Sequence, residues 1–362
     1  MKVVIAPDKF AGTLTAAEAA RAMAAGWAQA RPGDEIAIAA MADGGEGTVD
    51  VVQAADPACR RLTEEVADAR GRAVKADWLL LADGRALIEC AQACGLSRLA
   101  PDERDPKLAT TYGVGQLLLA AAAHDPVEIV VGLGGSATVD GGMGMATALG
   151  HRLLRADGNG LKVGGQSGRD LDRVEPAILS LPPVAAATDV TNPLLGPDGA
   201  AAVYGPQKGA SSEDVELLEE SLGRLADVVE RDAPGGPWRD LPGAGAAGGL
   251  GFGLSAFAGA RLMGGAATVA RLVGLDAALR GADVVLTGEG SLDAQSGAGK
   301  APWYVLELAR ATGARALAVA GRIADGAGQR FDAAADLGPH GMRRAEALVA
   351  ERTARLASQL RT

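Results

Sequence analysis

The sequence predicts an α/β protein in which a parallel-sheet domain is interrupted by a second, inserted α/β domain with a mixed sheet. Short apolar runs, each followed by an acidic or glycine-rich loop and a helix-like segment, open the chain. The same order returns near the end, which is typical of a parallel sheet. Between these parts, two hairpin signals indicate antiparallel strands. The length of 362 residues also favours two domains over a single core.

The first domain is predicted to comprise residues 1–58 and 281–362. Its first strand is an apolar run that ends at Pro7, and Thr15 with Glu18 matches a capping box at the start of a helix. Further strands are expected over 36–40, 282–286 and 314–320, with a loop over 287–293 and a helix over 302–312.

The inserted domain is predicted to span residues 59–280. Turn signals at 69–72 and 82–85 predict two hairpins. Residues 234–254 are too glycine-dense for regular structure and are expected to form an irregular crossing, with a lid or a hinge as the alternative. Strands are expected over 128–131 and 183–187, and helices over 107–123 and 213–231.

Composition narrows the classes of function. A net charge of −10 opposes binding to nucleic acid or anionic lipid, because those partners require clustered Lys and Arg. No apolar stretch approaches the roughly 20 residues that span a bilayer. The three cysteines and three histidines are scattered and lack metal-ligand spacing. We therefore expect a cytoplasmic protein, either a monomer or a homodimer, with small-molecule partners and no nucleic-acid or membrane partner.

A glycine-rich stretch over residues 132–144 lies between an apolar run and a helix-like segment. Glycines allow close approach of a ligand, and N–H groups at a helix start favour an anion. This pattern predicts a phosphate site. The alternative is a tight strand-to-helix turn whose glycines only relieve crowding.

Acids or hydroxyls beside glycine follow five of the predicted strands. Since the carboxyl ends of parallel strands meet at one edge of a sheet, a convergent site is expected there. Gathered carboxylates repel one another unless a cation lies among them, and Mg²⁺ with nucleotide phosphates meets that need. The alternative is that Asp and Gly merely form turns. The groups are Asp8, Asp43 with Glu46, residues 136–140, Asp189 and residues 289–293.

The familiar nucleotide-binding motifs are absent. The stretch that ends at Lys300 departs from a P-loop, because Ala301 stands where Ser or Thr is required. The first strand is followed by APDKFAG rather than GxGxxG, which disfavours a dinucleotide fold.

Seven blocks taken together resemble the type I glycerate kinases, in order and over nearly the whole chain. They are KVVIAPDKFAGTLTA, MADGGEGT, VGLGGSATVDGGMGMATALG, ATDVTNPLLG, YGPQKGA, GAGAAGGLGFGL and LTGEGSLDAQSGAGKAP. The resemblance implies ATP-dependent phosphorylation of D-glycerate, Mg²⁺ dependence, and a flavodoxin-like domain interrupted by a second α/β domain. Many members have lysine where this chain has Ala11, and Lys9 is the available substitute. The family includes producers of 2- and of 3-phosphoglycerate, and we expect the 2-phosphate.

Phosphoryl transfer needs positioning and charge neutralisation, so roles are assigned by chemical type, with the active site expected in the cleft between the domains. The catalytic candidates are Asp189, Lys9 and Asp43; the nucleotide-binding candidates are Gly134, Gly135, Ser136, Thr138 and Lys300; the substrate-binding candidates are Asp8, Asn192, Glu289, Ser291 and Arg322; and the metal candidates are Asp293 and Glu46.

Two readings from other classes remain open. An NAD-linked hydroxyacid dehydrogenase would share the parallel sheet and a small anionic substrate, although the missing GxGxxG disfavours it. A non-catalytic sugar-acid sensor would share the binding site alone.

Overall fold

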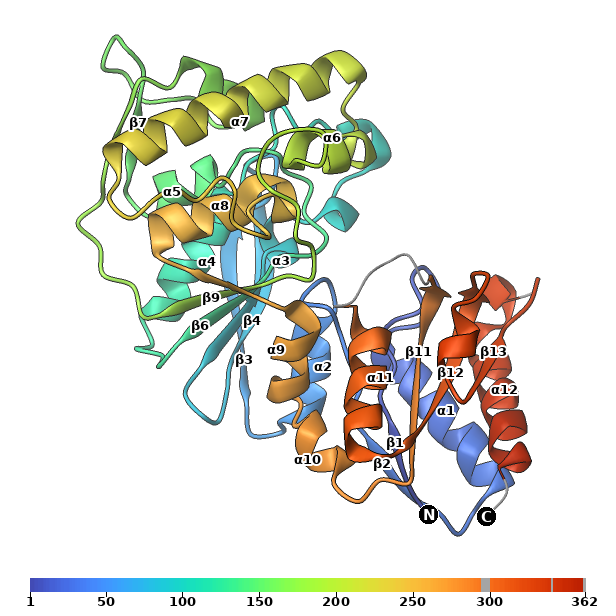
Figure 1. Ribbon diagram of the computed structural model, residues 1–362. Helices are drawn as coiled ribbons and strands as arrows, with labels where there is room; N and C mark the ends of the chain where they lie inside the picture. The colour runs from blue at the N-terminus through green and yellow to red at the C-terminus, as the bar shows by residue number, and fades with distance from the viewer. Residues whose placement is uncertain (294–299, 340, 361–362) are drawn as a thin grey trace. The chain divides into compact units, whose positions relative to one another are not determined.

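The structure is a computed structural model that describes residues 1–293, 300–339 and 341–360, and the chain divides into two compact units (Figure 1). Part of the last family-like block, residues 294–299, lies outside the described residues. Unit 1 contains Met1–Asp43, Asp50–Pro57 and Gly265–Thr362, and unit 2 contains Gly44–Val49 and Ala58–Gly264. The return to unit 1 lies at Gly265, although the sequence suggested residue 281, because α9 and α10 pack with α11.

Unit 1 is built on a five-stranded, entirely parallel sheet of order β13-β12-β11-β1-β2. Counted along unit 1 alone, this is the order 2-1-3-4-5 of flavodoxin-like folds, and it confirms the expected fold class. The order reverses between β1 and β11, where ligands of such sheets bind, beyond the carboxyl ends of the strands. The strands are β1 (Lys2–Ile5), β2 (Glu35–Ile38), β11 (Val284–Leu292), β12 (Arg315–Ile323) and β13 (Ala333–Asp336).

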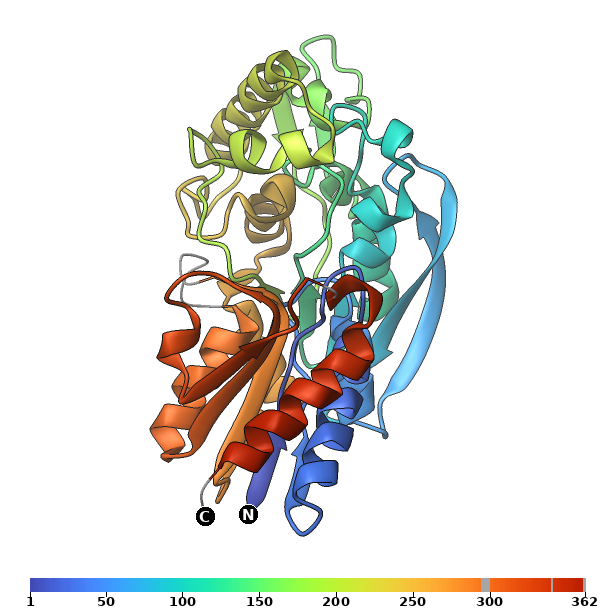
Figure 2. The ribbon, with the colours of Figure 1, turned by 90° about the vertical axis from the view of Figure 1, so that its right-hand side faces the viewer.

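Helices cover the sheet of unit 1, and α1 and α12 lie side by side (Figure 2). The predicted capping box is confirmed: Thr15 accepts from the N–H of Glu18, and the Glu18 side chain accepts from the N–H of Thr15. Close packing needs a glycine here, since a Cβ on Gly26 would lie 2.1 Å from the Ala350 carbonyl oxygen of α12. The helices are α1 (Ala16–Ala30), α2 (Thr48–Ala55, which crosses from unit 2), α9 (Gly265–Leu272), α10 (Leu275–Leu279), α11 (Ala301–Thr312) and α12 (Ala345–Gln359).

The prediction of a loop over residues 287–293 is wrong for most of its length. β11 continues to Leu292 and pairs with β12 as far as Ile323. The run TGEGSL lacks the apolar character of a buried strand, yet its backbone pairs regularly because glycines let the strands approach. A Cβ on Gly288 would lie 2.0 Å from the Val319 carbonyl oxygen. The carboxyl-terminal parts of β11 and β12 therefore carry polar residues on paired backbone. We call this part of the two strands the extension.

Unit 2 is built on a six-stranded mixed sheet of order β10-β9-β6-β5-β4-β3. The two predicted hairpins are confirmed, because β3, β4 and β5 pair antiparallel, while β5, β6, β9 and β10 run parallel. The strands of this sheet are β3 (Arg60–Ala67), β4 (Ala73–Leu80), β5 (Ala86–Glu89), β6 (Ile129–Gly132), β9 (Val184–Ala187) and β10 (Arg261–Met263), and β7 (Arg152–Leu154) pairs with β8 (Arg173–Glu175).

The helices α3 and α4 pack against this sheet, and α5, α6, α7 and α8 complete the unit. The predicted helix over 107–123 begins later, at Tyr112, and the helix expected over 213–231 is α7. The bounds are α3 (Ala91–Cys94), α4 (Tyr112–Ala122), α5 (Met143–Ala148), α6 (Ala200–Tyr204), α7 (Ser212–Asp232) and α8 (Ala246–Ala258).

The prediction that residues 234–254 lack regular structure is wrong for residues 250–254 of this segment, which are helical in α8, whereas Ala247, Gly248 and Gly249 near the start of α8 have positive φ and are not helical. Its glycines serve close packing rather than mobility. A Cβ on Gly251 would lie 2.1 Å from the Gly243 carbonyl oxygen, and one on Gly253 would lie 2.7 Å from the Cα of Gly142. High glycine content here reflects backbone-to-backbone contact inside a helix.

Replacing Gly251 by Ala is therefore expected to destabilise unit 2 by roughly 2–4 kcal/mol, since the methyl group would displace backbone. The matched control is Gly223→Ala in α7, where the nearest atom to a new Cβ is 4.0 Å away. That variant is expected to gain about 0.5–1 kcal/mol by lowering unfolded-chain entropy. Urea unfolding measures both, and equal effects would contradict the packing argument.

Candidate active site

The switch point of the unit 1 sheet brings three predicted acidic residues together. Asp8 follows β1, Asp43 follows β2, and Glu289 lies on the extension of β11. The backbone fixes Asp8, whose N–H donates to the Gly288 carbonyl at 2.8 Å and whose Oδ1 accepts from the Lys9 N–H at 2.6 Å. We call Asp8, Asp43 and Glu289 the acid cluster.

Burial and the charges of neighbouring carboxylates raise the pKa of two members of the acid cluster, Asp8 and Glu289. Burial, followed by the charge of Asp43, raises the pKa of Asp8 from 3.8 to about 7. Burial also raises the pKa of Glu289 to about 7, against the opposing charge of Lys300, and Asp43 and Asp293 add to the rise. Within the described part of the chain, Glu289 Oε1 is buried without a hydrogen-bond partner. These groups are therefore set to meet a cation or a ligand hydroxyl.

The carboxylates at these strand ends are oxygen donors, the ligand type that Mg²⁺ prefers. Among the described residues, no group of three or more His, Cys, Asp or Glu is arranged to hold a metal ion by itself. Mg²⁺ does not require one, because it commonly takes one or two carboxylates and completes its shell with phosphate oxygens and water. The carboxylates of unit 1 fit that role. Of the two metal candidates, Asp293 directly follows β11, and Glu46 is exposed in unit 2 and accepts from Ser97 Oγ at 3.0 Å.

The remaining candidates of unit 1 lie around the same strand ends. Ser291 pairs in register with Arg322 on the extension of β11 and β12, so the two side chains lie on one face of the sheet, and both residues are exposed. Lys300 directly precedes α11. A pocket of about 190 Å³ is lined by Arg322 together with Ala11, the residue that departs from the family pattern, and with Met342.

In unit 2, the glycine-rich loop packs on the acidic loop that follows β2. A Cβ on Gly132 would lie 2.1 Å from the Gly44 carbonyl oxygen, and one on Gly134 would lie 2.3 Å from the Cα of Gly45. Gly135 is exposed and has φ of +77°. Gly132 and Gly134 are therefore required for close backbone packing, independently of any ligand.

The structure corrects one part of the phosphate-site argument. The N–H groups at the start of α5 are not open to an anion, because the buried Asp140 carboxylate accepts from Gly142 and Gly144 at 3.1 Å each. It also accepts from the N–H and the hydroxyl of Thr111. Asp140 is thus a capping residue. Any phosphate bound here must use the loop before it, where Ser136 and Thr138 lie.

Lys208 is the functional candidate that the sequence did not single out. Its Nζ donates to Ser136 Oγ at 2.9 Å and to the Thr138 carbonyl at 2.8 Å, and it lies 5.9 Å from the ring centroid of Tyr204. The signal was its place in the block YGPQKGA, where two glycines flank a lysine; burial was not evident from that block.

The loop after β9 carries Asp189, which is half-buried, and Asn192. The Asn192 amide is engaged within the protein: Nδ2 donates to the Asp198 carbonyl, and Oδ1 accepts from the Tyr204 hydroxyl, both at 2.7 Å. This supports a role for Asn192 in shaping the loop, and its contact with substrate stays a prediction. Tyr204 thereby joins this loop to the lysine that holds Ser136.

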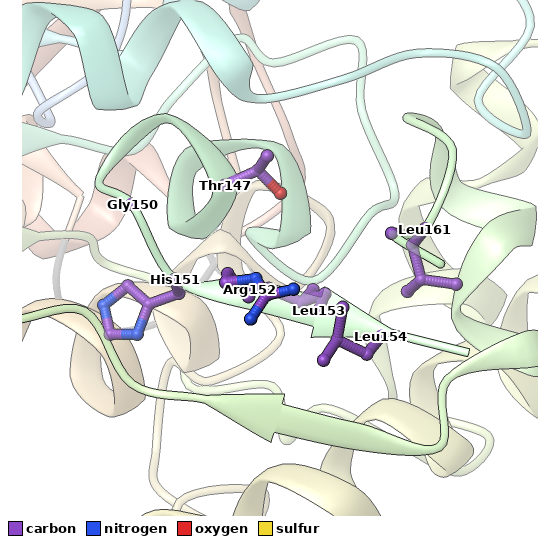
Figure 3. Close-up of a pocket in the computed structure, with 8 residues that line it drawn as sticks. Thr147, Gly150, His151, Arg152, Leu153, Leu154 and Leu161 are labelled. Carbon is purple, nitrogen blue, oxygen red and sulfur yellow. The ribbon is translucent and has the colours of Figure 1, made fainter. Parts of the chain in front are cut away.

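A surface pocket of about 310 Å³ lies elsewhere in unit 2, between α5 and β7 (Figure 3). It contains none of the predicted site residues. Both ring nitrogens of His151 already have backbone partners, Ala177 and Phe257, and Arg152 pairs with Glu175. Its polar groups are committed to the fold.

None of the helices within the described residues combines the length and the apolar character needed to cross a membrane.

Comparison with known proteins agrees with this architecture. The model of the glycerate kinase family matches residues 3–360. The chain is 41% identical to a glycerate kinase of Halalkalibacterium halodurans over 90% of this chain and 86% of that protein. It is 39% identical to the glycerate 2-kinase of Escherichia coli K12, over 91% and 87%.

A similar fold has been solved. The crystal structure of a Salmonella typhimurium LT2 protein assigned as glycerate kinase 2 superposes with a TM-score of 0.85 at 38% identity, covering 99% of this chain and 97% of that one. A full-length family match and relatives near 40% identity exclude the dehydrogenase and sensor readings. The chain is therefore an enzyme that belongs to the glycerate kinase family.

Proposed function

We propose that this enzyme transfers the γ-phosphate of ATP to D-glycerate, giving 2-phosphoglycerate, with Mg²⁺ bound to the nucleotide. The observation that carries the proposal is the acid cluster at the switch point of a flavodoxin-order sheet, in a chain of the glycerate kinase family. The 39% identity to a glycerate 2-kinase supports the 2-phosphate product.

The residues divide by chemistry. Gly134, Gly135, Ser136 and Thr138 are proposed to contact nucleotide phosphates, and Asp189 to orient or deprotonate the attacking hydroxyl. The acid cluster is proposed to bind glycerate hydroxyls, with the neighbouring cations Lys9, Lys300 and Arg322 meeting the glycerate carboxylate or a phosphate. Asp293 and Glu46 are the proposed contacts to Mg²⁺, which, when bound, neutralises charge on the β- and γ-phosphates.

An assay with ATP, Mg²⁺ and a panel of short hydroxyacids tests this function. D-Glycerate is expected to be the preferred acceptor, with no turnover when the metal is chelated, and ³¹P NMR of the product should show phosphate on the secondary oxygen. Phosphate on the primary oxygen would replace the 2-phosphate by the 3-phosphate. Lack of transfer to every hydroxyacid would contradict the proposal.

A further inference from the structure

Lys208 is buried in unit 2 without a carboxylate partner. Its exposed fraction is 6%, and among the residues that the structure describes it forms no ion pair. Lysine is rarely buried unless its charge is compensated, because the ammonium loses its hydration. The titratable groups that act on its charge are Cys94 and Cys90 of the α3 region and Asp140 before α5, and its Nζ lies 5.9 Å from the ring centroid of Tyr204 in α6. An incoming anion would supply the missing compensation.

The surrounding backbone is built to place this lysine. A Cβ on Gly205 would lie 2.5 Å from the Ala201 carbonyl oxygen, and one on Gly209, which has φ of +100°, would lie 2.6 Å from the Arg104 carbonyl oxygen. These glycines let the short turn Pro206–Lys208 pass close to its neighbours. The backbone conformation of this turn therefore directs the side chain of Lys208 toward the interior of unit 2.

The hydrogen bonds of Lys208 leave donor groups on the glycine-rich loop available to bind an anion. A hydroxyl has one donor and two acceptor positions, so an N–H donated to Ser136 Oγ leaves the Ser136 proton free to be donated elsewhere. Beside it, Thr138 Oγ1 is fully buried and has no hydrogen-bond partner among the described residues. Of the three N–H groups of Lys208, two have acceptors in the described chain. The loop thus holds spare donors next to a buried positive charge.

We propose that Lys208 is a positioning residue for phosphoryl transfer: it directs the Ser136 hydroxyl toward a phosphate of bound ATP, and that phosphate compensates its buried charge. This inference rests on the proposed function, which assigns Ser136 to the nucleotide. It adds Lys208, which donates hydrogen bonds to the glycine-rich loop from a segment that is distant from that loop in sequence.

Calorimetric titration with MgATP tests the inference on the whole enzyme. Lys208→Met is expected to weaken MgATP binding about 30- to 100-fold and Ser136→Ala about 10-fold. The double variant should bind no more weakly than Lys208→Met, because the serine contributes only when the lysine orients its hydroxyl. The matched control is Lys107→Met, since Lys107 is a half-buried lysine whose charge is already paired with Asp214, and its binding should equal that of the wild type.

A second readout is measured on the wild-type enzyme, with Lys208→Met as its control. Burial lowers the pKa of Lys208 from 10.5 to about 8, against the opposing charges of Cys94, Cys90 and Asp140. At pH 8.5 the phosphates are already deprotonated, since their last pKa lies near 6. Binding MgATP should therefore be accompanied by proton uptake, because the anion raises the pKa of Lys208. Titration in buffers of different ionisation enthalpy measures this uptake, which Lys208→Met should abolish.

The outcomes are separable. Unchanged MgATP affinity in Lys208→Met, additive losses in the double variant, or no proton uptake by the wild type would each overturn the inference. Intact MgATP binding with no phosphate transfer to D-glycerate would contradict only the proposed function.

Discussion

Replacing Asp189 by Asn is expected to lower kcat about 1,000-fold while leaving the KM for ATP within about twofold. A positioned general base contributes roughly 10² to 10⁴ in rate, and Asn retains the shape of the side chain without its ability to accept a proton. Asp189 is half-buried and directly follows Thr188, whose N–H donates to the Met263 carbonyl, so the loop start is anchored to the sheet. Steady-state kinetics with D-glycerate and MgATP measures the effect.

Asp198→Asn is the matched control. Asp198 lies in the same loop region and is exposed, and its contribution to the loop is a backbone carbonyl that accepts from Asn192, which the substitution leaves in place. Its kcat should remain at the wild-type value. Near-normal turnover in Asp189→Asn would remove Asp189 from the mechanism, and an equal loss in both variants would indicate a disturbed loop rather than lost chemistry.

Replacing Asp8 by Asn is expected to stabilise the enzyme above neutral pH while reducing its activity. In the folded protein, burial and then the charge of Asp43 raise the pKa of Asp8 from 3.8 to about 7. A raised carboxyl pKa means that the folded state holds its proton more tightly, so the associated stability is complete below about pH 4 and is lost as pH rises through 7. At about 1.4 kcal/mol for each pKa unit, the loss by pH 8 is on the order of 4 kcal/mol.

Urea unfolding of the Asp8→Asn variant across pH 4 to 8 measures this effect. Relative to wild type, its free energy of unfolding should be similar near pH 4 and should exceed wild type increasingly up to pH 8. Asp34→Asn is the opposite control. Burial alone would raise the pKa of Asp34, but hydrogen bonds from the N-terminal amine, Arg31 and Trp27 outweigh it and lower the pKa. That variant should lose stability at pH 8, and a pH-independent difference for Asp8→Asn would contradict the electrostatic account.

Much of the fold was predictable because local signals agreed with tertiary structure. The capping box at Thr15 and Glu18 needs only neighbouring residues, and the turns at 69–72 and 82–85 connect strands that are adjacent in the chain. The apolar runs of β1, β6 and β9 are nearly fully buried, which is why their composition identified them.

Glycine was the main source of error. The same residue forms turns, mediates close backbone contact and exposes backbone to ligands, and composition does not separate these uses. Residues 250–254 were therefore taken for irregular chain although they are helical in α8, and the β11 extension was taken for a loop. Which use applies depends on what lies opposite, such as Gly243 opposite Gly251, and that partner is set by tertiary packing.

The candidate residues at the carboxyl ends of strands were predictable from the sequence, whereas Lys208, which lies in a turn elsewhere in the chain, was not. Asp8 and Glu289 follow from the rule that parallel strands present their carboxyl ends together, and burial and the charge of Asp43 raise the pKa of both. Lys208 follows from no such rule. It reaches Ser136 from a turn that is 72 residues further along the chain, and tertiary packing brings that turn to the loop. Likewise, the Asp140 carboxylate caps α5, a use that its position beside glycines did not distinguish from metal binding.

The interrupted sheet of unit 1 also bears on synthesis at the ribosome. In that sheet the central strand β1 pairs with β11, and Val3 lies opposite Val284. The strand β1 is synthesised early, but its partner β11 is synthesised only after the whole of unit 2. The last strand of unit 2 ends at Met263. Contacts so distant in sequence form slowly, whereas nearer ones can form as the chain emerges. The nascent enzyme is thus expected to acquire its inserted unit first and to close the sheet that carries its acid cluster last.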